Sequence, residues 1–143
     1  MTLSEKEIIA MIRSRSTAGG GALLRGIGDD CAVLRRSGGL VELVTTDSLL
    51  EGVHFDSAWH PPRLLGRKAA AVNLSDIAAM GGVPRYAFLN LGLPTDYAAA
   101  WLEEFMAGFL TCLAEFNTIL VGGDTVRSPA GIMLSVTLLG EAT

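Results

Sequence analysis

The stretch RKAAAVNLSDIAAMGGVP, residues 67–84, predicts the central layout of this chain of 143 residues. A proline pair at 61–62 opens a helix just before it, because proline is tolerated in the first helical turn. Small and aliphatic residues then recur at helical spacing until the glycine pair at 81–82 ends the helix. An apolar run at about 85–91 follows and predicts a strand. We therefore expect a long helix that leads directly into a strand.

The other elements follow from similar patterns. A capping box predicts a short amphipathic helix over residues 4–15, followed by a flexible break at 17–21. A second long helix is expected from a cap at Thr95 or Asp96 to about Phe116, with its aromatic side chains in the core. Further strands are expected at about 31–35, 40–46, 118–122 and 131–139, with GGDTVRSP as a turn between the last two. The expected fold class is α+β, with a mixed or antiparallel sheet covered by two long helices.

Composition and charge disfavour several classes of function. Hydrophobic residues make up 50% of the chain, enough for one core, so we expect a single domain over residues 1–143. The net charge is −4 and the 11 basic residues form no stripe, so nucleic-acid binding is not expected. No uncharged apolar run is long enough for a membrane span. Charged residues at 5–7 stand where a secretory signal needs apolar ones, so we expect a cytoplasmic protein.

Two further features concern the surface and the thiols. The mean hydropathy of +0.41 is high for a soluble domain and indicates a surface that a second copy or a further domain covers.

Cys31 and Cys112 show no CxxC spacing and lack the density of a disulfide scaffold. Both are expected to be buried thiols.

Five of the seven aspartates lie in short clusters rich in glycine or threonine: GIGDD (26–30), TTD (45–47), NLSD (73–76) and GGDT (122–125). A carboxylate held where a strand ends and a turn begins is stiff and open on one side, which suits a hard cation such as Mg²⁺ carrying phosphates. Asp76 is expected near the C-terminal end of an apolar helix, where the macrodipole disfavours it unless a metal compensates. The pattern predicts a polynuclear magnesium site.

Each acidic motif also allows a purely structural interpretation. The chain has no P-loop motif, and Cys31 replaces the third glycine of a dinucleotide fingerprint, so the phosphate-site hypothesis depends on the aspartates. From the residues alone the alternatives stay open: a turn or helix cap for Asp29 and Asp30, a strand end for Asp47, a hairpin turn for Asp124, a core position for His54, and pairing with Asp124 or with a phosphate for Arg127.

Taken together, four segments resemble the N-terminal domain of the thiamine-monophosphate kinases. They are GIGDDCAVL, VTTDSLLEGVHF, the stretch at 67–84, and VGGDTVRSP. These kinases belong to the aminoimidazole ribonucleotide synthetase (PurM-like) superfamily of ATP users that lack a P-loop. The resemblance implies a PurM-like N-terminal domain whose sheet pairs with a second copy in a homodimer. It also implies a second α/β domain, which is absent from these 143 residues.

The resemblance further implies an activity and a set of site residues. The activity is ATP-dependent phosphorylation of thiamine monophosphate to thiamine diphosphate, which needs aligned Mg²⁺ ions and no catalytic base. The alternatives are a non-catalytic dimerisation or nucleotide-binding fragment, and another ATP-dependent synthetase of the superfamily. Carried over by position, Mg²⁺ ligands would be Asp30, Thr45, Thr46, Asp47, Asp76 and Asp124; ATP would contact Gly123 and Asp124; thiamine monophosphate would contact His54; Asp29 also matches its motif.

Overall fold

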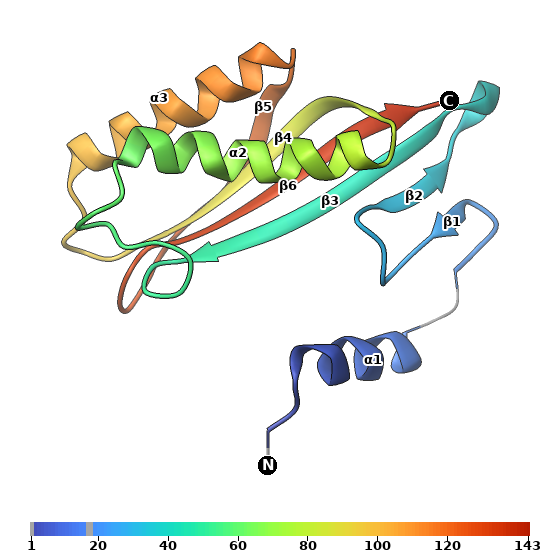
Figure 1. Ribbon diagram of the computed structural model, residues 1–143, viewed down its shortest axis with the longest axis horizontal. Coiled ribbons are helices and arrows are strands. Elements are labelled where there is room, and N and C mark those ends of the chain that lie inside the picture. The colour runs from blue at the N-terminus through green and yellow to red at the C-terminus, as the bar shows by residue number, and fades with distance from the viewer. Residues whose placement is uncertain (1, 17–18) are drawn as a thin grey trace.

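A six-stranded mixed sheet forms the centre of the computed structural model, which describes residues 2–16 and 19–143 (Figure 1). The strand order is β1-β2-β3-β6-β4-β5, with every neighbouring pair antiparallel except β4 and β5. The elements in chain order are α1 (Glu5–Arg15), β1 (Leu23–Arg25), β2 (Ala32–Arg35), a short 3-10 turn (Ser37–Gly39), β3 (Val41–Leu50), α2 (Pro62–Ala79), β4 (Val83–Leu93), α3 (Ala99–Glu115), β5 (Ile119–Arg127) and β6 (Met133–Ala142).

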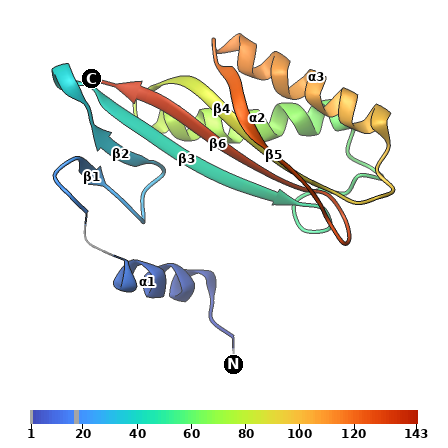
Figure 2. The ribbon, with the colours of Figure 1, turned by 180° about the vertical axis from the view of Figure 1, so that it is seen from behind.

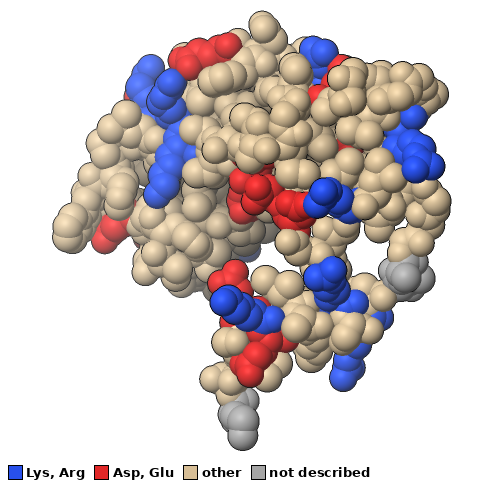
Figure 3. Space-filling model, turned by 45° about the vertical axis from the view of Figure 1, so that its right-hand side comes forward, with Lys and Arg blue, Asp and Glu red and all other residues tan. Residues whose placement is uncertain are grey.

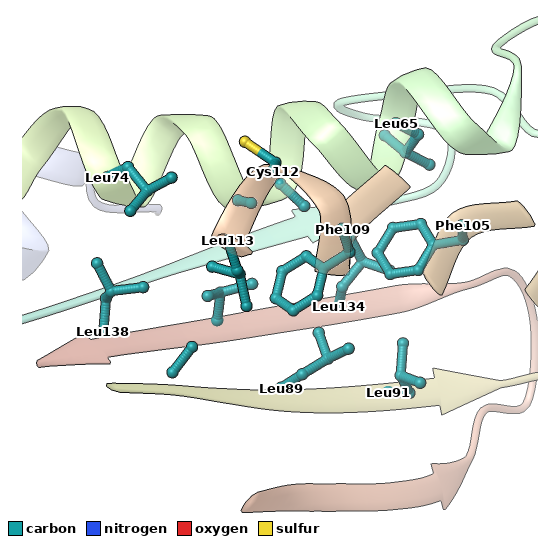
Figure 4. Close-up of a cluster of buried hydrophobic side chains, with 14 of the residues drawn as sticks. Leu65, Leu74, Leu89, Leu91, Phe105, Phe109, Cys112, Leu113, Leu134 and Leu138 are labelled. Atoms are coloured by element: carbon teal, nitrogen blue, oxygen red, sulfur yellow. The ribbon is translucent and has the colours of Figure 1, made fainter. Parts of the chain in front are cut away.

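One face of the sheet is covered by α2 and α3, and the core lies between them. Along β6, Leu134, Val136 and Leu138 are buried while the residues between them are only partly so, as the twofold alternation of a strand requires. Phe105 and Phe109 of α3 are fully buried above these strands (Figure 4). The aromatic stripe of the third helix is therefore core, as predicted.

The two long helices approach each other closely because each has a glycine at the crossing. A β-carbon on Gly66 of α2 would overlap the carbonyl oxygen of Phe105. A β-carbon on Gly108 of α3 would overlap the carbonyl oxygen of Arg63. Backbone thus packs on backbone at this point, which only glycine permits.

The opposite face of the sheet carries no helix, and the N-terminal helix is separate from the core. Viewed from behind, β3 and β6 lie in front of α2 (Figure 2). On this face Tyr86 and Phe88 of β4 are 48% and 38% exposed. The short helix α1 has the predicted capping box but no buried residue. The open face and α1 therefore leave apolar side chains in contact with solvent.

The predicted fold class is confirmed, while several boundaries are wrong. GGDTVR is part of β5 and does not form a turn, because this segment pairs in parallel with β4 up to Arg127. Asp47 lies inside β3, which continues to Leu50, and so does not end a strand. The N-cap of α3 is Ala98, without a side-chain cap, in place of the expected cap at residue 95 or 96.

Two further points concern the N-terminal third and the helices. Strand β1 was not predicted, because its three residues are all exposed and show no alternation. Of the flexible break expected at residues 17–21, residues 17 and 18 lie outside the described residues. Within the described ranges, no helix has both the length and the apolar character needed to cross a membrane.

Candidate functional site

The loop before β2, the middle of β3 and the last turns of α2 place four predicted site residues next to one another. The Thr45 hydroxyl donates to the carbonyl oxygen of Asp30 at 3.0 Å and lies 3.4 Å from Oδ2 of Asp76. Asp47 follows Thr45 by two residues on β3, so both side chains lie on the helix-covered face. Cys31 adds a tie, since its Sγ donates to the Asp76 carbonyl at 3.4 Å. We call Asp30, Thr45, Asp47 and Asp76 the acidic cluster.

The electrostatics of the acidic cluster favour a cation. Burial, followed by the hydrogen bond and the negative charge of Asp47, raises the pKa of Asp76 above its ordinary value. Burial, together with the charges of Asp76 and Asp30, raises the pKa of the Cys31 thiol to about 11. Acidic side chains also form a patch in the middle of one face of the molecule (Figure 3). Hard oxygen donors in a negative field are what Mg²⁺ binds.

Thr46 lies outside the acidic cluster, although it is adjacent in sequence to two of its members. Its hydroxyl donates to the Val136 carbonyl at 3.1 Å and accepts from the Thr137 hydroxyl at 3.1 Å. Because neighbouring residues of a strand alternate between faces, its side chain points away from Asp47. Its hydroxyl is used within the sheet.

Gly123 and Asp124 lie across the sheet from the acidic cluster. The register aligns Asp47 with Val136, Val136 with Leu89, and Leu89 with Gly123. Three strand spacings separate the first residue from the last, roughly 14 Å. A β-carbon at Gly123 would overlap the Leu89 carbonyl oxygen, so this position, with φ of 148°, requires glycine.

The residues expected to form one polynuclear magnesium site therefore lie in two places: the acidic cluster, and Asp124 on β5. Across residues 2–16 and 19–143, no three side chains of the His, Cys, Asp and Glu types are grouped so that they could hold a metal ion. The domain brings together Thr45, the backbone carbonyl of Asp30 and the carboxylates of Asp47 and Asp76, and it leaves the motif of Asp124 apart. Asp124 itself accepts a hydrogen bond from the Thr125 backbone at 2.9 Å.

His54 lies in the loop after β3, and its ring is oriented by the backbone. The Leu50 N–H donates to Nδ1 of His54 at 2.9 Å. A backbone amide only donates, so Nδ1 is unprotonated and the neutral ring carries its hydrogen on Nε2. The structural alternative of a core histidine is wrong, because His54 is exposed. Its Nε2–H remains available as a donor.

Asp29 and Arg127 have different surroundings. Asp29 pairs with Arg25 at 2.9 Å, and its carboxylate also accepts from the Asp30 backbone at 2.8 Å. The Asp30 backbone first, and then Arg25, hold the pKa of Asp29 below its ordinary value. The turn interpretation of Asp29 thus describes the structure well. Arg127 ends β5, where it aligns with Leu93 of β4.

Sequence reasoning missed Glu51, which braces the His54 loop. Its carboxylate accepts hydrogen bonds from the Ile132 backbone at 3.0 Å, from the Ser57 backbone at 3.2 Å and from the Ser57 hydroxyl. These bonds, that of the Ser57 hydroxyl first, hold the pKa of Glu51 below its ordinary value. A glutamate directly after a strand and before Gly52 was the available signal.

A Glu51→Ala variant should lose about 2 kcal/mol of unfolding free energy, because it leaves partly buried N–H groups without an acceptor. Since the folded pKa is depressed, this contribution is complete above the ordinary glutamate pKa of about 4.3 and is lost as the pH falls through the lower folded value. Urea unfolding at neutral and acidic pH measures both effects. Glu103→Ala, at an exposed position of α3, is the control and should change little. Equal stability of the two variants at neutral pH would contradict the bracing role.

Cys31 and Cys112 are buried, as predicted, and burial raises both thiol pKa values. We expect a maleimide to modify the folded chain at neutral pH about 100-fold more slowly than the urea-unfolded chain, because only the thiolate reacts. Mass spectrometry over time follows each thiol, and Cys112→Ser isolates Cys31. Modification of Cys31 at the unfolded rate would show that the acidic cluster is open at that point.

The structure defines a class of α+β domain: a mixed sheet with two helices on one face, and oxygen ligands from a loop, a strand and a helix near the end of α2. Residues 28–142 match the family described as AIR synthase related protein, N-terminal domain. This chain therefore belongs to that family, and the PurM-like fold expected from its motifs is confirmed.

Within this family, the chain is similar to thiamine-monophosphate kinases. The thiamine-monophosphate kinase of Synechococcus elongatus is 45% identical over 113 residues, which are 79% of this chain and 34% of the relative. The structure of AaThiL with AMPPCP and TMP superposes with a TM-score of 0.87 at 35% identity, over 99% of this chain and 44% of that one. The crystal structure of thiamine monophosphate kinase from Aquifex aeolicus superposes with a TM-score of 0.81 at 32% identity. The match covers 98% of this chain and 44% of that one. The chain thus spans about a third to less than half of these proteins.

Proposed function

We propose that this chain is the N-terminal, nucleotide- and magnesium-binding domain of an enzyme that transfers a phosphoryl group from ATP to thiamine monophosphate, giving thiamine diphosphate and ADP. The observation that carries the proposal is that Thr45 contacts both the Asp30 backbone and the Asp76 carboxylate, with Asp47 beside Asp76, in a chain of which 79% matches a thiamine-monophosphate kinase. The enzyme is thereby a transferase of thiamine biosynthesis, and we place it in the cytoplasm.

The chemistry explains why carboxylates serve this reaction better than a catalytic base. The acceptor oxygen of a phosphate monoester is already anionic near neutral pH, so no proton needs to be removed before attack. The difficulty is the repulsion between two polyanions, and bound Mg²⁺ neutralises them and aligns the in-line transfer. The raised pKa of Asp76 fits such an ion, because a cation would relieve the repulsion from Asp47.

Each predicted residue has a place in this proposal. Asp30, Asp47 and Asp76 would hold Mg²⁺ through their carboxylates, and Thr45 would supply an oxygen from the same cluster. Thr46 would join them only through its backbone or after exchange of its hydrogen bonds. Gly123 and Asp124, on the other side of the sheet, would contact ATP, and Asp124 would also bind its metal ion. His54 would contact thiamine monophosphate.

A second copy of the chain is proposed to cover the open face of the sheet. Tyr86 and Phe88 lie exposed there beside partly buried residues of β6. Apolar residues at this density on one face are typical of an interface. Sedimentation at micromolar concentration is expected to give a dimer, and a monodisperse monomer would contradict this part of the proposal.

A non-catalytic nucleotide-binding fragment is the second candidate. It is favoured by the separation of Asp124 from the acidic cluster, since the described residues contain no complete metal cage. The region beyond the matched domain in the relatives would then supply the missing ligands. This candidate predicts binding without turnover.

Calorimetry distinguishes the candidates. We expect a non-hydrolysable ATP analogue to bind the chain only with Mg²⁺, and thiamine monophosphate to bind the resulting complex. A parallel assay for thiamine diphosphate then tests turnover directly. Binding of both ligands without product supports the fragment, and binding of neither in the presence of Mg²⁺ contradicts the proposed site on this chain.

A further inference from the structure

The buried face of α2 contains an amide that packing alone does not explain. Asn73 is 1% exposed, and the residues one turn before and after it, Ala69 and Ile77, are fully buried. Its Nδ2 donates to the Ala69 carbonyl at 2.9 Å. Within the described part of the chain, no donor lies within hydrogen-bond distance of its Oδ1. A buried acceptor without a donor lowers the stability of a fold, so packing alone would favour an apolar residue at this position.

The orientation of the Asn73 amide is fixed by the helix. A carbonyl oxygen only accepts hydrogen bonds, so the group that faces Ala69 is the NH2 of the amide and not its oxygen. Exchange of the two would place two oxygens against each other. Oδ1 of Asn73 is therefore directed away from the Ala69 carbonyl and is free to accept.

Asn73 lies beside the acidic cluster. It precedes Asp76 by three residues on α2, and side chains at this spacing are neighbours, with β-carbons about 5–6 Å apart. Helical side chains lean toward the N-terminal end, so the Asp76 carboxylate leans over the turn that carries Asn73. In the residues that the structure describes, the buried polar ones are Thr45, Asn73 and Thr118. Two of these three therefore lie at the acidic cluster.

Hydrogen-bond acceptors outnumber donors around this point. The carboxylates of Asp47 and Asp76 and the amide oxygen of Asn73 all accept. The Thr45 hydroxyl has a single hydrogen, which it donates to the Asp30 carbonyl at 3.0 Å. The missing donors are those that a hydrated cation brings, because its charge suits the carboxylates and its water molecules donate hydrogen bonds.

We propose that Asn73 is a positioning residue for the magnesium ion, and that its Oδ1 accepts a hydrogen bond from a water molecule of that ion. This inference rests on the proposed function and deepens it, since Asn73 is outside the predicted set of ligands. Mg²⁺ dehydrates reluctantly and keeps several water molecules when it binds a protein. An acceptor one helical turn from Asp76 orients such water molecules, and an ion that has lost them does not need it.

A comparison of two cations tests this role. Ca²⁺ exchanges more of its water for protein oxygens than Mg²⁺ does, so loss of a water-mediated contact should affect Ca²⁺ less. Asn73→Leu is expected to raise the Kd for the Mg²⁺ complex of the non-hydrolysable ATP analogue about tenfold, and that for the Ca²⁺ complex about twofold at most. Calorimetry measures both values. Asp76→Asn removes a direct ligand and should weaken the binding of both complexes.

The melting temperature gives a second readout. Leucine has the same branching as asparagine, a higher helix propensity and no unpaired acceptor. Without metal, Asn73→Leu should therefore melt about 3 °C above the unsubstituted chain. A lower melting temperature would show that Oδ1 has a donor without metal, and would contradict the inference. Thr118→Val removes a buried hydroxyl that bonds to Phe116, away from the acidic cluster, and as the control it should leave both Kd values unchanged.

Asn73→Ala repeats the cation comparison with a side chain too small to overpack the core. If both variants bind the two complexes as the unsubstituted chain does, while Asp76→Asn loses them, the inference is wrong and the proposed function stands. An equal loss for Mg²⁺ and Ca²⁺ would show that Asn73 only holds the helix in place, and would also overturn the inference. If the unsubstituted chain binds neither complex, the inference and the proposed function are both contradicted.

Discussion

A Gly108→Ala variant is expected to unfold with a free energy about 2 kcal/mol below that of the unsubstituted chain. The added methyl group would overlap the backbone oxygen of Arg63, which cannot rotate away as a side chain would. The two helices must separate, and the separation loosens the packing of Phe105 and Phe109, both fully buried. Overpacking of this kind costs about 1–3 kcal/mol or more, while the helix propensity of alanine returns only about 1 kcal/mol.

Urea unfolding followed by circular dichroism measures the loss of stability. Two further variants separate the effect of helix propensity from that of the close helix contact. Ala71→Gly, at an exposed position of α2, measures the propensity difference alone and should cost about 1 kcal/mol. Gly66→Ala with Gly108→Ala should cost less than the sum of the single changes, because helices that are already apart accommodate the second methyl. If Gly108→Ala were as stable as the unsubstituted chain, the close crossing would be wrong.

Asp76→Asn is expected to weaken magnesium-dependent nucleotide binding by about 100-fold or more while stabilising the metal-free chain. Loss of a direct ligand should exceed the 10- to 100-fold cost of losing an outer-shell partner. The stability gain follows from the raised pKa of Asp76: its ionised form opposes folding above the folded pKa, and the effect disappears as the pH falls below the unfolded value. Asparagine removes that charge beside Asp47.

Calorimetry with the ATP analogue and thermal melting with and without Mg²⁺ separate these effects. The unsubstituted chain should melt higher with Mg²⁺, and Asp76→Asn should not respond. Asp96→Asn, an exposed carboxylate in the loop before α3, serves as the matched control and should retain both the nucleotide affinity and the response. Unchanged magnesium-dependent affinity in Asp76→Asn would remove it from the proposed set of ligands.

The parts of the fold that were predicted well are those that depend on local chemistry. The proline pair at the start of α2 and the glycines after it located that helix to within a few residues, and the apolar run at 131–139 located strand β6. The segment after Leu120 was misread because two adjacent glycines followed by an aspartate usually form a turn. Here Gly122 lies against the Phe88 ring and Gly123 against the Leu89 backbone, so the strand continues.

The candidate site residues came from the acidic motifs and the resemblance, and only some of their positions in space could be expected from them. Thr45, Asp47 and Asp76 lie together because the last turns of α2 pack on β3, although the short connection after α2 leads to β4. The distance to Asp124 depends on β6 and β4 lying between β3 and β5. Strand order is a property of the whole chain, and no motif contains it. The bracing by Glu51 likewise depends on a partner 81 residues away in sequence.

The location of the metal is the most direct test of the account. We would titrate the ¹⁵N-labelled chain with Mn²⁺ in the presence of the non-hydrolysable ATP analogue and follow paramagnetic broadening of each backbone amide. The account predicts that the amides of Asp30, Thr45, Asp47 and Asp76 broaden first, and that Asp76→Asn abolishes this selective broadening. Broadening that begins at exposed carboxylates elsewhere, such as Asp96 or Glu103, and spares these four amides would contradict the proposed magnesium site.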